Sequence, residues 1–208
     1  MRRLRAMGAA AFGLTLTVGC GGGDSPPPPE AALPRVVATT TIVGDLVRSV
    51  GGPEVELEVL MGPGIDPHLY KASAGDVRRL SSAQLVVANG LHLEGKLGEV
   101  LAGIGARGVG TLAVGECLPA GRLIPLEGFA TLHDPHVWFD VSLWSRAAEC
   151  VRDALSELDP DHAAAYRIAV VPAIVGLVHG LERHAGRIGD RAGGRLAATP
   201  CRAAGVAG

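Results

Sequence analysis

The sequence lacks several features that mark common classes of protein. Aromatic residues make up only 3% of the 208-residue chain, so a core must be built from Leu, Val, Ile and Ala, for which a hydrophobic content of 48% is ample. The formal net charge is −2, and no cluster of Lys and Arg occurs beyond the N-terminus. This charge pattern argues against nucleic acid as a partner.

Cysteine is also scarce. The chain holds Cys20, Cys117, Cys150 and Cys201, with no CxxC or other spacing typical of a metal–thiolate site. Cys150 falls on the apolar side of a predicted helix, where we expect it to act as a small buried hydrophobe. An odd number of cysteines remains if Cys20 is modified, and we therefore expect no disulfide framework.

Residues 1–19 have the composition of a signal peptide. Three arginines within the first five residues precede a mainly apolar stretch, Ala6 to Val18. This stretch is shorter than the roughly 20 residues that a transmembrane helix needs. The segment ends in Thr17-Val18-Gly19-Cys20, which resembles a bacterial lipoprotein signal, although Thr17 stands where Leu is usual.

This ending predicts cleavage before Cys20 and a lipid anchor on its sulfur, with a plain secretory signal as the alternative. Residues 20–34 then form the anchor cysteine and a Gly/Pro-rich linker, in which Pro26 to Pro29 favour an extended, semi-rigid spacer. We expect an extracytoplasmic protein anchored to a membrane, in the periplasm or on the cell surface.

From Arg35 onward, short apolar strands alternate with amphipathic helices. The strand-like runs are residues 36–40, 55–61, 84–88 and 109–114. Helical spacing of apolar residues occurs over 42–50, 77–80, 93–104 and 144–155. Gly51-Gly52 is expected to end the first helix, and Ser73 to Asp76 resembles a capping box before the second. The pattern predicts an α/β domain, a parallel sheet flanked by helices, over residues 35–158.

Two copies of Asp-Pro-His, Asp66-Pro67-His68 and Asp134-Pro135-His136, follow strands of this predicted sheet. Proline stiffens the backbone before each histidine, and neutral imidazole is the commonest protein ligand for a transition metal. Ligands of parallel sheets bind beyond the carboxyl ends of the strands. We therefore expect His68 and His136 to converge at one edge of the sheet as two metal ligands. Asp66 and Asp134 are expected to orient their loops by local hydrogen bonds, or to fix a histidine tautomer.

Other polar residues near these motifs are expected to have lesser roles. His133 lies three residues before His136, but the proline between them argues against a helical chelating pair, so we expect a rim residue. His92, beside a predicted helix start, is expected to be structural or to support a ligand. Asp140 is expected to cap the helix that follows it.

Residues 159–188 predict one long helix that starts near Asp159-Pro160. Pro172 lies inside it and should kink or break it, because proline lacks the amide hydrogen that a helix interior needs. After Gly189 the hydrophobic patterning fades.

Three segments closely resemble the zinc/manganese-binding lipoproteins of bacterial ABC importers: Val36 to Gly52 (VVATTTIVGDLVRSVGG), Gly64 to Leu101, and Asp134 to Trp144 (DPHVWFDVSLW). The resemblance implies two α/β lobes, with residues 35–158 as the first lobe and 159–188 as the joining helix. It implies that metal is held by one histidine from each of two first-lobe loops, here His68 and His136. A histidine or glutamate and an aspartate from the second lobe complete the site. The loaded protein, expected to be a monomer, hands the ion to a membrane permease driven by an ATPase.

The sequence departs from this family near its end. Leu196 to Thr199 match the approach to a third ligand, but Pro200-Cys201-Arg202 stand where the ligand histidine should come. We interpret residues 189–208 as a truncated or aberrant start of the second lobe. A lobe of about 100 residues is then missing, as in a truncated or frame-shifted gene product.

The predicted function is capture of a divalent transition metal, zinc or manganese, without catalysis, because a closed four-ligand site binds metal without activating water. One alternative is an adhesin-like surface lipoprotein with a vestigial metal site. Another is a zinc hydrolase, in which an open site activates water; it has Asp140 as its nearby candidate base and no HExxH motif. The ligands that distinguish zinc from manganese are expected in the missing part.

Overall fold

The computed structural model describes residues 32–129 and 131–176. The predicted signal peptide, Cys20, most of the linker and residues 189–208 lie outside the described residues, as does the end of the predicted joining helix. No helix of the described part is long and apolar enough to cross a bilayer.

A four-stranded parallel sheet forms the centre of the fold, as the sequence predicted. Its strands are β1 (Arg35–Ala38), β2 (Glu56–Val59), β3 (Leu85–Ala88) and β4 (Gly110–Ala113). They lie in the order β2-β1-β3-β4, and every neighbouring pair is parallel. The crossovers place all four carboxyl ends at one edge, where binding sites of parallel sheets are found.

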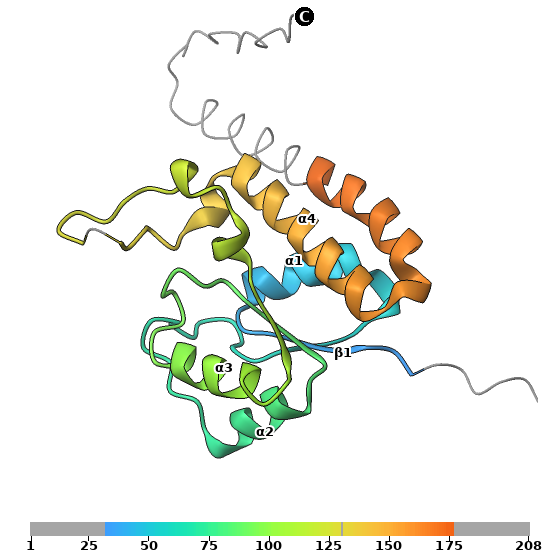
Figure 1. Ribbon diagram of the computed structural model, residues 1–208, viewed down its shortest axis with the longest axis horizontal. Coiled ribbons are helices and arrows are strands. Elements are labelled where there is room, and N and C mark those ends of the chain that lie inside the picture. The colour runs from blue at the N-terminus through green and yellow to red at the C-terminus, as the bar shows by residue number, and fades with distance from the viewer. Residues whose placement is uncertain (1–31, 130, 177–208) are drawn as a thin grey trace, which may run out of the picture. The chain divides into compact units, whose positions relative to one another are not determined.

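Helices cover both faces of the sheet (Figure 1). One layer contains α1 (Thr41–Gly51) and α4 (Val141–Leu158), and the other contains α2 (Ala74–Ser82) and α3 (Leu97–Gly105). Successive residues of β1 enter opposite layers, because side chains alternate along a strand. Val36 and Ala38 join the core beneath α1 and α4, whereas Val37 joins the core beneath α2 and α3.

Side-chain caps and a glycine fix the ends of α1 and α4. The Thr40 side chain accepts a hydrogen bond from the Val43 amide at the start of α1 (3.2 Å). Gly52 ends that helix at φ 55°, a left-handed conformation that glycine adopts without steric cost. Asp140 caps α4 by accepting from the amides of Ser142 and Leu143, which confirms its predicted role.

A disulfide joins Cys117 and Cys150, with the Cα atoms 6.6 Å apart. The expectation that the chain has no disulfide framework is therefore wrong. Cys150 is buried on the inner side of α4, as predicted, but it is bonded to another cysteine rather than packed as a free thiol. The bond fastens the turn after β4 (Val114–Cys117) to α4.

A final helix packs against the layer that contains α1 and α4. It begins after the 3₁₀ turn Pro160–His162 and is helical from 163 to 176, the last described residue. Tyr166 and Val170 anchor it in the core beneath α1 and α4. The helix continues through exposed Pro172, so this residue does not break it; of the predicted kink or break, only the kink stays a prediction.

Candidate metal centre

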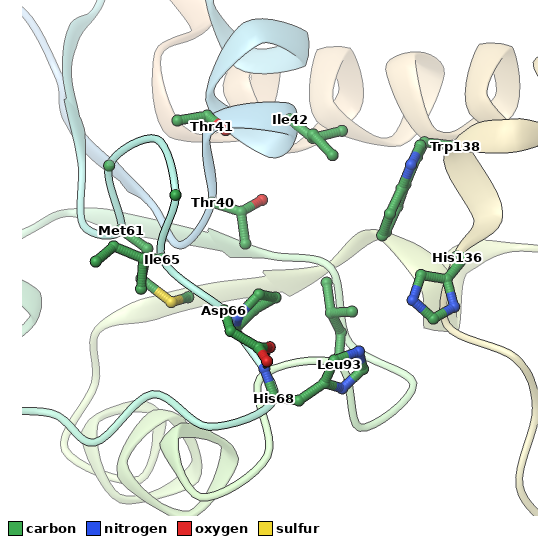
Figure 2. A pocket seen from close by; sticks show the side chains of 13 residues that line it. Thr40, Thr41, Ile42, Met61, Ile65, Asp66, His68, Leu93, His136 and Trp138 are labelled. Atoms are coloured by element: carbon green, nitrogen blue, oxygen red, sulfur yellow. Dashed lines mark hydrogen bonds between the residues drawn. The ribbon is translucent and has the colours of Figure 1, made fainter.

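His68 and His136 come together at the carboxyl edge of the sheet (Figure 2). His68 lies in the loop that follows β2, and His136 lies between β4 and α4. Their ring centres are 5.5 Å apart, and the ring planes are tilted by 55°. The predicted convergence of the two Asp-Pro-His motifs is therefore confirmed.

This spacing suits two imidazoles that share one ion. Zinc binds a histidine nitrogen at about 2.1 Å, which places the ion roughly 3.2 Å from the ring centre. Two rings at a tetrahedral angle then have centres about 5 Å apart. The observed 5.5 Å is close to that value, so the ring spacing is compatible with both imidazoles binding the same ion.

Both motifs use the same local hydrogen bond. The Oδ1 atom of Asp66 accepts from the backbone amide of His68 (2.9 Å), and Asp134 Oδ1 accepts from the amide of His136 (2.9 Å). The aspartate closes a turn over the proline, which already restricts the backbone. Each histidine is thus held by its own tripeptide, as the sequence indicated.

The second motif also controls the histidine ring. Asp134 Oδ1 lies 2.6 Å from His136 Nδ1, which favours the tautomer with a proton on Nδ1 and leaves Nε2 free to bind an ion. The hydrogen bond from the His136 amide, together with the ring contact, holds the pKa of the Asp134 carboxyl below its usual range. Trp138 also contacts the His136 ring, in an edge-on arrangement with ring centres 5.1 Å apart.

A cavity of about 300 Å³ lies between the two histidines. Its walls come from the start of α1, the loop after β2, and the side chains of Leu93 and Trp138 (Figure 2). The lining is mixed: Ile42 is 37% exposed and Ile65 is 49% exposed, and the polar residues Thr40, Thr41 and Asp66 also line the cavity.

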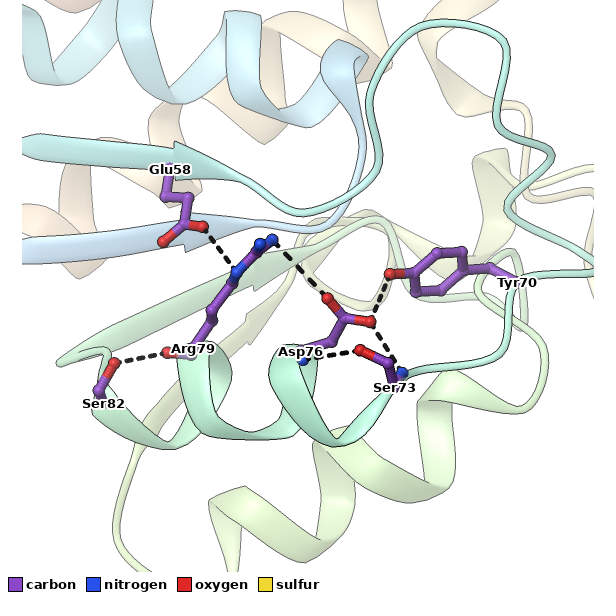
Figure 3. Close-up of polar contacts among 6 residues, drawn as sticks. All are labelled: Glu58, Tyr70, Ser73, Asp76, Arg79 and Ser82. Carbon is purple, nitrogen blue, oxygen red and sulfur yellow. Dashed lines mark hydrogen bonds and ion pairs between the residues drawn. The ribbon is translucent and has the colours of Figure 1, made fainter.

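The loop that carries His68 is fastened at its far end by the capping box of α2 (Figure 3). Asp76 accepts hydrogen bonds from the Ser73 amide and from the Tyr70 hydroxyl, both at 2.8 Å, and Ser73 Oγ accepts in return from the Asp76 amide. Burial raises the pKa of the Asp76 carboxyl, but these hydrogen bonds outweigh it and hold that pKa below its usual range. Arg79, which pairs with Glu58 of β2, ties the same helix to the sheet (3.3 Å).

The other predicted residues lie away from this cavity. His133 forms an isolated antiparallel bridge with Pro125, and His92 is exposed and lines a different cavity. Asp140 caps α4 and also pairs with Arg122 (3.3 Å) beside a second cavity of about 270 Å³, on another side of His136. Within the described ranges, no group of three or more His, Cys, Asp or Glu residues is placed to hold a metal.

Sequence reasoning missed a buried polar network beneath the two histidines. Glu94 is 3% exposed and accepts hydrogen bonds from the Thr39 hydroxyl and from the amides of Asn89 and Gly90 (2.8, 2.6 and 3.1 Å). Glu94 lies between His92 and Lys96 in a stretch of mixed polarity, so nothing in the local pattern indicated its burial. A buried charge requires strong partners, and these come from residues that only the fold brings close. Leu91 and His92, between these partners, have left-handed φ values of 53° and 64°. Each costs on the order of 1–3 kcal/mol for a residue other than glycine, so the surrounding contacts must impose them.

Comparison with known proteins agrees with this architecture. Residues 36–170 match the family model described as "Zinc-uptake complex component A periplasmic". The manganese-binding lipoprotein MntA of Bacillus subtilis is 42% identical over 161 residues, 77% of this chain and 52% of the relative. The zinc-binding protein TroA of Treponema pallidum is 47% identical over 128 residues, 61% of this chain and 40% of the relative.

The solved structure of the periplasmic zinc-binding protein TroA from Treponema pallidum aligns with a TM-score of 0.66 and 40% identity. The alignment covers 71% of this chain and 52% of that structure. The chain thus spans about half the length of these relatives, and the predicted α/β fold, a parallel sheet flanked by helices, is confirmed. The family model covers well over half of the chain, so the chain belongs to the family of periplasmic zinc-uptake component A proteins.

Proposed function

We propose that this chain captures a divalent transition metal, zinc or manganese, outside the cytoplasm and delivers it to an ABC permease driven by its ATPase. His68 and His136 are two of the ligands. The observation that carries this proposal is the pairing of two Asp-Pro-His loops, whose imidazole centres lie 5.5 Å apart beside a cavity that both histidines line. The metal is the cargo, so the chemistry is coordination and release.

The donor set fits either ion. Nitrogen ligands suit zinc, whereas manganese accepts more oxygen, and the two imidazoles leave room for either completion of the site. The two curated relatives are named for manganese and for zinc respectively, which supports both choices for this chain.

An extracytoplasmic location is part of the proposal. The Cys117–Cys150 disulfide supports it, because disulfides persist in oxidising compartments such as the periplasm and the cell surface. Anchoring through a lipid on Cys20 is supported by the Val18-Gly19-Cys20 pattern and by relatives that are named lipoproteins. We further propose that the protein acts as a monomer.

The alternative functions gain no support. A hydrolase needs a free general base near the ion, whereas the Asp140 carboxylate is engaged by the start of α4 and by Arg122. The relatives described above are named as metal-binding proteins, which favours the binding function over both the hydrolase and the adhesin.

Isothermal titration of the full chain with zinc and with manganese tests this function, using Cys20→Ser throughout to prevent lipidation. His68→Gln and His136→Gln should each weaken binding at least tenfold, because each removes one of the two imidazoles. His162→Gln is the matched control: His162 follows α4 whereas His136 precedes it, and 18 helical residues separate them by about 27 Å. Equal affinity for the wild-type chain and the two ligand variants would refute the proposed site.

A further inference from the structure

We propose that the segment from Asn89 to Gly95, called the platform below, sets the distance between the two metal-binding imidazoles, with Glu94 as its positioning residue. The inference rests on the proposed function, because it concerns the geometry of the same site. The platform follows β3, the strand between β1 and β4 in the sheet. It touches the loops of both histidines.

One end of the platform holds the loop of His136. The Asn89 side-chain amide donates a hydrogen bond to the backbone oxygen of Pro135 (2.9 Å), and Asn89 is fully buried. Pro135 immediately precedes His136 and has a restricted backbone. A shift of Asn89 is therefore transmitted directly to the second imidazole.

The other end of the platform contacts the loop of His68. A Cβ atom added to Gly95 would lie 2.7 Å from the backbone oxygen of His68, so the two backbones are in direct contact. Gly95 also has a φ of 46°, which only glycine adopts without strain. Between the two ends, buried Leu93 lines the cavity that the histidines share (Figure 2).

Glu94 holds the platform in an otherwise unfavourable shape. The platform contains the left-handed residues Leu91 and His92, and three hydrogen bonds to the Glu94 carboxylate close the turn around them. Both carboxylate oxygens accept, Oε1 from the Thr39 hydroxyl and the Asn89 amide, and Oε2 from the Gly90 amide. A glutamine has the same shape, but its NH₂ group must face one of these donors, so the turn loses at least one hydrogen bond.

The test compares Glu94→Gln with the wild-type full chain by zinc titration and by the visible absorption spectrum of bound Co²⁺. We expect zinc affinity to fall by about 10- to 100-fold, the range typical for residues that orient metal ligands. The Co²⁺ bands should also shift or lose intensity, because the two imidazoles no longer meet the ion at the same spacing. A purely structural role would lower the amount of folded protein without changing the spectrum of the bound ion.

A second variant tests the platform if Glu94→Gln does not fold. Gly95→Ala should push the loop of His68 away and weaken zinc binding at least tenfold. Gly98→Ala is its matched control, three residues further on in α3, where an added Cβ meets nothing within 4 Å. Wild-type zinc affinity and an unchanged Co²⁺ spectrum in Glu94→Gln, or equal binding by Gly95→Ala and Gly98→Ala, would overturn the inference.

The wild-type chain separates this inference from the proposed function. If zinc binding is lost in His68→Gln and His136→Gln but retained in full by the platform variants, the proposed function stands and the positioning role fails. If the wild-type chain binds no zinc, the proposed function fails, and the positioning role is overturned with it.

Discussion

Removing the Cys117–Cys150 disulfide should lower the free energy of unfolding by about 4 kcal/mol. The two cysteines are 33 residues apart in the sequence, and the chain-entropy model gives about 4 kcal/mol at 25 °C for a closed loop of this length. The loss is large, because small domains have a total stability of about 5–15 kcal/mol. The closed loop also contains His136, so the same change frees one end of the segment that carries a proposed ligand.

Urea unfolding of the full chain at pH 7, followed by circular dichroism, measures this effect. The variant replaces both cysteines with serine, because a single replacement leaves a buried unpaired thiol. Wild-type protein unfolded with and without dithiothreitol provides a second measurement of the same quantity. Cys201→Ser is the control, since it removes a thiol but keeps the bonded pair.

The two measurements should agree within about 1 kcal/mol, given the usual error of extrapolated unfolding energies. A difference below about 1 kcal/mol between the double variant and the control, with no effect of dithiothreitol, would refute the reasoning. It would mean that the packing of α4 against the sheet already restricts this loop without the covalent bond.

Three further predictions follow. Two imidazoles leave open positions on a metal that prefers four ligands, so the full chain should bind zinc with a micromolar or weaker Kd. A nanomolar Kd measured by calorimetry would contradict this prediction. The Asp159 carboxylate lies 2.7 Å from His162 Nδ1 and raises the pKa of His162, and Glu54 acts in the same direction. The contact with Asp159 therefore stabilises the fold below the ordinary histidine pKa of about 6.5. This stabilisation is lost as pH rises through the raised pKa. The midpoint of thermal unfolding should therefore decline over that range in the wild type and less in His162→Gln, and equal slopes would contradict the assignment. Ser73→Ala should lower the free energy of unfolding in urea by about 1 kcal/mol, because it removes the cap of α2. The contribution of the Asp76 carboxylate to stability should disappear as pH falls through its lowered pKa. An unchanged urea midpoint in Ser73→Ala would argue against the capping box.

The sequence predicted the sheet and its helices well, because their signals are local. Apolar runs of strand length and caps such as Ser73 and Asp140 each depend on a few neighbouring residues. The convergence of His68 and His136 was also predictable, since the topology of a parallel sheet brings the loops after its strands to one edge. The predicted boundaries of the signal peptide, linker, lobe and joining helix stay predictions.

The features that sequence reasoning missed depend on contacts between distant residues. The pairing of Cys117 with Cys150 has no spacing motif and becomes visible only when α4 packs beside the turn after β4. The helix predicted to start near Leu93 begins at Leu97 instead, because the preceding turn is left-handed and buries Glu94 against Thr39 of another loop. Such a tertiary contact overrides the local helical spacing of apolar residues.

The connection between Cys117 and His136 is fixed at both ends but exposed in the middle. The disulfide holds its start and Asn89 holds its end, while Ile124 and Phe129 are 68% and 60% exposed in the arm between them. Lengthening a loop costs only about 0.6 kcal/mol for each doubling of its length. The arm is therefore the place where we expect an insertion of new sequence to cost little stability and to leave the spacing of the histidines unchanged.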